Sequence, residues 1–290
     1  CEIGNGKKIN IEFVSANPTG ILHIGNARGG AYGDSLARIM DFCGYDVTKE
    51  YYLNDAGNQV TKLANSIKSR YLDLCNIENE FPENGYPGQE IYDIANLIYE
   101  DNKDTLVDAD LDIFKKYGIE FLCKQIFADL EEYRIKYDVV TSEKSIYEKY
   151  SISDMLNKIK ENGYLYEKDG ATWFKSSAIY DDQDHVFVKK DGSYTYLVPD
   201  IAYHIDKLNR GFDKLINVLG TDHHGYIARL KGAVKALDED DSKINVKLLQ
   251  LVRIVRNNEV VVMHKRSGNI ITLKDLIDEV GVNAARYYFS

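Results

Sequence analysis

The segment from Glu12 to Gly30 combines polar side chains with a turn that suits phosphate binding. An apolar strand is predicted over residues 9–14, and a turn with proline and glycine then leads through His23-Ile24-Gly25-Asn26 into a helix. Backbone N–H groups at the start of a helix point toward an anion, and the helix dipole favours its charge. Gly25 permits close approach because it has no side chain, and His23 can donate to a phosphate oxygen. The segment indicates a nucleotide phosphate site, with an ordinary structural turn as the alternative.

A second candidate, near the end of the sequence, is a basic loop. Two strands are predicted over residues 251–255 and 260–263, joined by an Asn-rich turn, and the basic, glycine-containing residues 264–269 follow. Lys265 and Arg266 in a loop that closes could neutralise the charge of a polyphosphate in a transition state. The alternative is an exposed basic loop with no ligand.

These two segments resemble the signature sequences of the class I aminoacyl-tRNA synthetases. Residues 23–26 resemble the HIGH signature, and residues 262–266 resemble the KMSKS signature. The residues around them resemble the arginyl-tRNA synthetases in particular, and we identify the chain as a member of that family. Four blocks in order carry this resemblance: residues 12–20, 196–203, 220–226 and 275–289.

The resemblance implies an α/β fold, namely a Rossmann-like nucleotide-binding fold with a parallel central sheet of the HUP or class I synthetase type, interrupted by a mostly helical insertion. It also implies an arginine–tRNA ligase. Such an enzyme activates L-arginine with ATP and Mg²⁺ to arginyl-adenylate and pyrophosphate, then transfers arginine to the 3′-terminal ribose of tRNA-Arg, without a covalent enzyme intermediate. Activation is expected to need bound tRNA, and no editing domain is expected.

The amino-acid site implied by the resemblance is built to receive a guanidinium. A guanidinium presents a planar fork of donors that carboxylates match best. Glu12 and Asp200 lie in two blocks that should meet at the carboxyl ends of the central strands, where open α/β sheets bind ligands. From the residues alone, a solvated acid on an edge strand is the alternative for Glu12. The implied substrate-binding residues are Glu12, Ser15, Asn17, Tyr196 and Asp200.

The nucleotide site implied by the resemblance departs from the family pattern at two places. Asn26 replaces the last histidine of HIGH, and Val262 and His264 replace the first lysine and the serine of KMSKS. His23, Asn26 and Lys265 are the expected catalytic residues, with Lys265 stabilising the leaving pyrophosphate. The full expected set for ATP is His23, Gly25, Asn26, Gly220, Asp222, His224, Met263 and Lys265.

No metal site is expected from the histidines. His223 and His224 adjoin Asp222, and His204 could add a fourth ligand. Adjacent residues of a strand point to opposite faces, so they seldom share one ion. Four widely spaced cysteines form no C-x-x-C pair, so a zinc site is not expected either, and Cys43, Cys75 and Cys123 are expected to be buried or half-buried.

The elements that must position these residues read as a nucleotide-binding fold split by an insertion. Strands are expected over 46–53, 139–140 and 215–219, with short β segments over 164–197. The first helix carries Leu36, Ile39 and Met40 at helical spacing, Ser153 is expected to cap a later helix, and a capping box at Thr272 and Asp275 predicts a helix that stops at Gly281. Other helices are expected over residues 58–74, 90–99, 110–137, 154–162, 201–208 and 226–237.

Four segments are expected from this pattern. The first half of the catalytic domain covers 1–75, the helical insertion 76–136, the second half with a β-rich connection 137–250, and the KMSKS-like loop with the start of a helical region 251–290. Because the family's N-terminal and anticodon-binding domains lie outside this sequence, we expect a catalytic core that charges tRNA weakly or not at all.

The composition is consistent with such an enzyme and excludes few other classes of protein. The net charge of −10 over 290 residues argues against a general nucleic-acid binder, although a local basic face would suffice for tRNA. No run is long and apolar enough to span a bilayer, so no membrane partner is expected. The unpaired cysteines suit a reducing cytoplasm, and we expect a cytoplasmic, monomeric protein. Two alternatives stay open: another HxGH-type nucleotidyltransferase, which would have no reason to retain Glu12, Tyr196 and Asp200, and a non-catalytic paralogue.

Overall fold

The computed structural model describes residues 3–221, 224–252, 254–256, 259–261 and 271–290. Contacts within the chain define two compact units, each built from several segments. Unit 1 comprises Cys1–Val14, Tyr32–Tyr52 and Tyr137–Leu251, and unit 2 comprises Ser15–Ala31, Leu53–Lys136 and Val252–Ser290.

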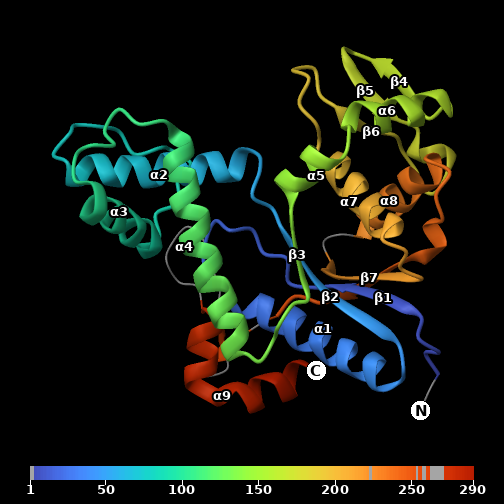
Figure 1. Cartoon of the computed structure of the whole chain (residues 1–290), viewed down its shortest axis with the longest axis horizontal. Coiled ribbons are helices and arrows are strands. Elements are labelled where there is room, and N and C mark those ends of the chain that lie inside the picture. The colour runs from blue at the N-terminus through green and yellow to red at the C-terminus, as the bar shows by residue number, and fades with distance from the viewer. Residues whose placement is uncertain (1–2, 222–223, 253, 257–258, 262–270) are drawn as a thin grey trace. The chain divides into compact units, whose positions relative to one another are not determined.

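The centre of unit 1 is a largely parallel sheet. In the described part of the chain five strands lie in the order β3-β2-β1-β7-β8, and the pairs β1–β2, β1–β7 and β7–β8 are parallel (Figure 1). This arrangement confirms the expected Rossmann-like α/β fold. Strands β2 and β7 lie on opposite sides of β1, so the strand order reverses between β1 and β7. Open α/β sheets bind ligands at the carboxyl ends of the strands at such a reversal. The strands are β1 (Lys8–Glu12), β2 (Asp46–Leu53), β3 (Val139–Ser142), β7 (Lys214–Gly220) and β8 (Ile244–Leu249).

Helices pack on this sheet through a core that includes the fully buried Phe174, Val198 and Leu230. In Figure 1, α7 and α8 run close to strand β7. Helix α7 begins four residues before the predicted start, because Pro199 is tolerated in a first turn, and Asp200 therefore belongs to the helix. The helices of this unit are α5 (Glu143–Lys149), α6 (Ile152–Glu161), α7 (Leu197–Asn209) and α8 (His224–Ala236), and α1 (Ile24–Phe42) is shared between the two units.

Two helix predictions in this region are wrong in detail. On α1, the buried stripe consists of small residues such as Ala31 and Ala37, whereas Ile39 is 61% exposed. The reason is close packing: a Cβ at Gly33 would lie 2.3 Å from the Phe13 ring. Helix α6 is capped by Ser151, whose hydroxyl accepts from the Asp154 N–H, and not by Ser153.

A small antiparallel sheet completes unit 1 and confirms the predicted β-rich segment. It has the order β4-β5-β6 and contains β4 (Leu165–Lys168), β5 (Ala171–Phe174) and β6 (His185–Val188). Asp169 and Gly170, both at positive φ, make the tight turn between β4 and β5. Short 3₁₀ turns cover Ser176–Ala178 and Asp241–Lys243.

Unit 2 contains a helical core formed by α2 (Asn58–Leu74), α3 (Gln89–Asn102) and α4 (Leu111–Glu132). Fully buried Tyr71 donates to the Lys103 carbonyl and packs against Phe114, so α2 shares one core with the two helices of the predicted insertion. Helix α4 ends five residues earlier than predicted, because Arg134 takes a left-handed backbone conformation.

The end of unit 2 confirms the predicted capping box. The Thr272 hydroxyl accepts from the Asp275 N–H at 2.9 Å, and the Asp275 carboxylate accepts from the Thr272 N–H at 2.9 Å. Helix α9 (Leu273–Phe289) breaks at Gly281, which has a φ of 78°. The two short strands β9 (Ile254–Arg256) and β10 (Glu259–Val261) form an antiparallel pair. None of the helices that the structure describes is long and apolar enough to cross a membrane.

Candidate active site

The centre of the candidate site in unit 1 is Glu12, the last residue of β1. Its side chain is buried, because β1 is an inner strand between β2 and β7, so the solvated edge acid considered above is excluded. The Lys207 ammonium donates to Glu12 Oε2 at 2.5 Å, and the Asn217 amide donates to the same oxygen at 2.9 Å. Lys207 is itself 0% exposed and lies 4.1 Å from the centroid of the Tyr203 ring. Glu12 therefore lies at the carboxyl edge of the sheet with a cation already beside it.

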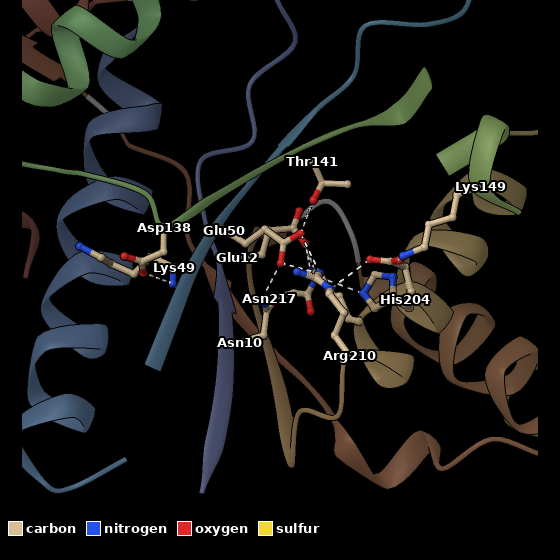
Figure 2. Close-up of polar contacts among 12 residues, drawn as sticks. Asn10, Glu12, Lys49, Glu50, Asp138, Thr141, Lys149, His204, Arg210 and Asn217 are labelled. Carbon is tan, nitrogen blue, oxygen red and sulfur yellow. Dashed lines mark hydrogen bonds and ion pairs between the residues drawn. The ribbon is translucent and has the colours of Figure 1, made fainter. Parts of the chain in front are cut away.

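His204 extends this arrangement and is held neutral. One ring nitrogen, Nδ1, lies 2.8 Å from the Asp200 carbonyl, so it carries the proton in this network. The other, Nε2, accepts from the Asn217 amide at 3.1 Å. Burial, with a smaller contribution from the nearby Lys207 ammonium, lowers the pKa of His204 to about 4. Figure 2 shows His204 and Asn217 in this contact.

Asp200 lies in the first turn of α7 and is the second predicted carboxylate. The Tyr226 hydroxyl donates to it at 2.7 Å, and the Tyr196 ring stacks on Tyr226 with centroids 6.1 Å apart. Burial raises the pKa of Asp200 to about 7, with further rises from Glu12 and Glu143 that the Tyr226 hydrogen bond partly offsets. Tyr196 is 62% exposed, so its ring can form a wall that a ligand reaches. Two acids with aromatic neighbours suit a planar organic cation.

A buried ionic network holds the strands and helices that carry this site. The Glu50 carboxylate on β2 is fully buried and accepts from Asn10 on β1, Thr141 on β3 and Arg210 after α7 (Figure 2). Arg210 also pairs with Asp206, to which Lys149 of α5 donates. Because these contacts join three neighbouring strands to two helices, they fix α7 against the sheet.

The predicted phosphate turn lies in unit 2 and has a defined geometry. The Gly25 N–H donates to His23 Nδ1 at 3.1 Å, which places the His23 proton on Nε2 and leaves that nitrogen as a donor. The His23 N–H donates to the Asn26 amide oxygen at 3.0 Å, so the Asn26 side chain closes the turn at the start of α1. A Cβ at Gly25 would lie 2.9 Å from His23 Cε1, which explains the glycine.

The same turn is hydrogen-bonded to the residues that follow the basic loop. The Ile24 N–H donates to the Ile271 carbonyl at 3.0 Å, and the Leu273 N–H donates to the Leu22 carbonyl at 2.9 Å. His23 and Thr272 face each other in an isolated antiparallel bridge. The structure thus joins, within unit 2, the first signature segment to the chain directly after the second.

The segment between β1 and this turn is strained. Val14 and Ser15 both have positive φ, at 68° and 40°, which is costly for a β-branched valine. Such conformations concentrate at functional sites. Farther along, the Asn17 amide donates to Gln59 at 2.7 Å in unit 2.

Of the remaining predicted residues, the structure describes Gly220 but not most of the others. Gly220 ends β7 beside Leu249 of β8. Asp222, His223, Met263 and Lys265 lie outside the described residues, as does the side chain of His224. Among the side chains that are described, no three histidine, cysteine, aspartate or glutamate residues are placed to hold a metal ion. Cys43, Cys75 and Cys123 are half-buried free thiols, as predicted.

Lys207, Asn217 and Glu143 are not among the site residues predicted from the sequence. A signal for Lys207 was present, because it follows Asp200 by seven residues, or two helical turns, and so shares its helix face. Nothing local marks Asn217 or Glu143, which reach the site only through the fold.

Known proteins resemble the chain along almost its whole length. A family model described as tRNA synthetases class I (R), catalytic domain, matches residues 1–287. The arginine–tRNA ligase of Bacillus subtilis (strain 168) is 49% identical over 292 residues, covering 99% of this chain and 52% of that protein. The arginine–tRNA ligase of Geobacillus kaustophilus (strain HTA426) has the same identity and coverage. The chain thus spans about half the length of the curated relatives it matches.

Solved structures of arginyl-tRNA synthetases also resemble this chain. A Campylobacter jejuni protein provisionally assigned as an arginyl-tRNA synthetase has a TM-score of 0.89 and 39% identity, covering 98% of this chain and 62% of that one. The arginyl-tRNA synthetase of Thermus thermophilus has a TM-score of 0.68 at 16% identity, with 98% of this chain and 56% of that chain covered, which shows a shared fold alone.

Proposed function

The chain belongs to the catalytic domains of the class I arginyl-tRNA synthetases, and on this premise we propose that it binds L-arginine and ATP and forms arginyl-adenylate. The observation that carries the proposal is a pair of carboxylates, Glu12 at the carboxyl end of β1 and Asp200 in the first turn of α7, with the Tyr226 and Tyr196 rings beside Asp200. A guanidinium can be shared by two carboxylates, whereas a lysine ammonium presents a point charge and citrulline presents none. Asn17, Ser15 and Tyr196 are the proposed further contacts to the amino acid.

In the proposed reaction, a carboxylate oxygen of arginine attacks the α-phosphorus of ATP in line. A new P–O bond forms, the bond to the bridging oxygen of the β-phosphate breaks, and pyrophosphate leaves. A ribose hydroxyl at the 3′ end of tRNA-Arg then attacks the mixed anhydride and releases AMP. Catalysis consists of positioning and charge stabilisation.

His23 and the turn that holds it are the proposed contacts to the ATP phosphates. The tautomer set by Gly25 leaves His23 Nε2–H as a donor. Asn26, Gly220, Asp222, His224, Met263 and Lys265 complete the proposed nucleotide site. Mg²⁺ would enter with the ATP phosphates and offset their charge. Because no cluster of metal-ligating side chains exists among the described residues, we assign it no protein ligand.

The proposal is tested by calorimetric titration of the chain with arginine, lysine and citrulline. We expect arginine to bind and the other two to bind at least about 100-fold more weakly, since a site built for buried hydrogen bonds rejects ligands that leave them unmade. Glu12→Gln and Asp200→Asn should each weaken arginine binding, and Asp182→Asn, an exposed residue of the same unit, should not. Equal binding of lysine, or wild-type affinity in both site variants, would refute the guanidinium site.

The transfer step needs a separate measurement. Arginine-dependent exchange of pyrophosphate into ATP, with and without tRNA-Arg, reports activation, and charging of tRNA-Arg reports transfer. We expect exchange only with tRNA present and weak or no charging. Robust charging by this chain would contradict the second expectation without affecting the first.

A further inference from the structure

The feature that the proposed function leaves unexplained is a fully buried lysine in the amino-acid site. Lys207 is 0% exposed, and its ammonium contacts Glu12 Oε2 at 2.5 Å. Burying an ammonium costs several kcal/mol unless a counter-ion and further contacts compensate. Here Glu12 is the counter-ion, and the Tyr203 ring adds a cation–π contact at 4.1 Å.

The geometry around Glu12 restricts how its carboxylate is oriented. Two donors from two different elements, Lys207 of α7 and Asn217 of β7, converge on the single oxygen Oε2. Asn217 is itself fixed by its contact with His204. Lys207, Asn217 and His204 are all almost completely buried. A carboxylate held at one oxygen by two fixed donors has little freedom to rotate. Its orientation is therefore decided by α7 and β7 as well as by the strand that carries it.

The charges around Glu12 also indicate that Lys207 acts on this carboxylate. Glu12 and Glu143 lie close enough to Asp200 to raise its pKa, so three acidic residues gather in this part of unit 1. Lys207 balances one of these carboxylates and also lowers the pKa of Asp200. Without Lys207, the buried Glu12 carboxylate would lose the ammonium that faces it.

We propose that Lys207 is a positioning residue of the arginine site, which fixes the orientation of the Glu12 carboxylate toward the guanidinium. This inference rests on the proposed function. It differs from a purely structural role because it requires Lys207 to act on arginine through Glu12. The two residues should consequently behave as one unit in arginine binding.

The test is a double-mutant cycle on arginine affinity in the complete chain. The variants are Glu12→Gln, Lys207→Met and the double variant, with Asp182→Asn as the control. Calorimetry gives the Kd of arginine and, separately, of ATP, and circular dichroism verifies folding. We expect each single variant to weaken arginine binding by about 10- to 100-fold, the range for losing a charge-assisted hydrogen bond. The double variant should bind no more weakly than Glu12→Gln alone, and ATP affinity should stay unchanged.

Three results would overturn the inference: wild-type arginine affinity in Lys207→Met, a double variant weakened by the product of the two single effects, or an equal loss of ATP affinity. Each single variant leaves one buried charge unpaired, whereas the double variant leaves none, so the double variant decides if one single variant fails to fold. Further weakening relative to the single variant that folds would then refute coupling, and unchanged affinity would support it. Absence of arginine binding by the wild-type chain would instead refute the proposed function itself, and with it this inference.

Discussion

Replacing Asp200 by asparagine should stabilise the protein while removing arginine binding. Burial and two neighbouring acids raise the pKa of Asp200 from 3.8 to about 7. Between these values the unfolded chain has lost a proton that the folded chain retains, so stability falls as the pH rises toward 7. Asparagine does not titrate, and its amide oxygen can still accept from Tyr226, which donates to Asp200 at 2.7 Å. The variant therefore keeps the hydrogen bond and avoids the cost of ionisation.

The size of the effect follows from the pKa difference. A rise of about 3 pKa units corresponds to about 4 kcal/mol at pH 8, and to less than half of that at pH 5, where Asp200 in the folded chain is still protonated. For a domain of this size, about 4 kcal/mol corresponds to a melting-temperature increase of roughly 8 °C. His204, with a pKa of about 4, contributes a slope of opposite sign. That slope is common to both proteins and cancels in the difference.

The assay is thermal unfolding of wild type, Asp200→Asn and Asp182→Asn at pH 5, 6.5 and 8, with arginine titrations at pH 8. We expect the difference between Asp200→Asn and wild type to grow with pH, and the control to follow wild type throughout. A difference that is independent of pH, or a wild type more stable than Asp200→Asn at pH 8, would refute the assignment of a carboxylate whose ionisation destabilises the fold.

Three further substitutions test other parts of the structure. Gly25→Ala should weaken ATP binding about tenfold or more with little loss of stability, because a Cβ would displace the His23 ring; unchanged ATP affinity by calorimetry would contradict this. Glu50→Gln should lower stability by about 1–3 kcal/mol in thermal unfolding, since Arg210 loses the charge of Glu50 and keeps only Asp206 as an acidic partner, and a loss below about 1 kcal/mol would show that the network is not needed. Thr272→Ala should cost about 1 kcal/mol through loss of the cap; a melting temperature equal to wild type would argue that the capping box adds nothing.

Local sequence signals predicted the elements whose limits are set by neighbouring residues in the chain. Strand β2 and helix α2 begin and end at the predicted residues, and the capping box at Thr272 forms as predicted. The failures have two kinds of cause. Ser151 and Ser153 both suit a helix cap, and only packing decides between them. Helix α1 buries small residues because it approaches the sheet closely, which a search for large apolar residues overlooks.

The candidate site was predicted less completely than the fold. Resemblance supplied Glu12 and Asp200, and both lie in one unit, where Glu12 contributes to the raised pKa of Asp200. Resemblance did not supply Lys207 or Asn217, which reach Glu12 across 195 and 205 residues of sequence. Contacts over such distances leave no periodicity that links Glu12 to these residues. Only the seven-residue spacing from Asp200 marks Lys207, and no local pattern marks Asn217.

These long separations also determine when the site can form during synthesis. Strand β1 is made well before β7, which is completed only at Gly220, yet β1 lies between β2 and β7 in the sheet. At about 5–20 residues per second, the ribosome needs roughly 10–40 s to proceed from Glu12 to Lys207. During that interval one edge of β1 lacks its strand partner and the Glu12 carboxylate lacks its ammonium. The nascent segment that carries β1 therefore needs protection from premature pairing with other chains until β7 is made.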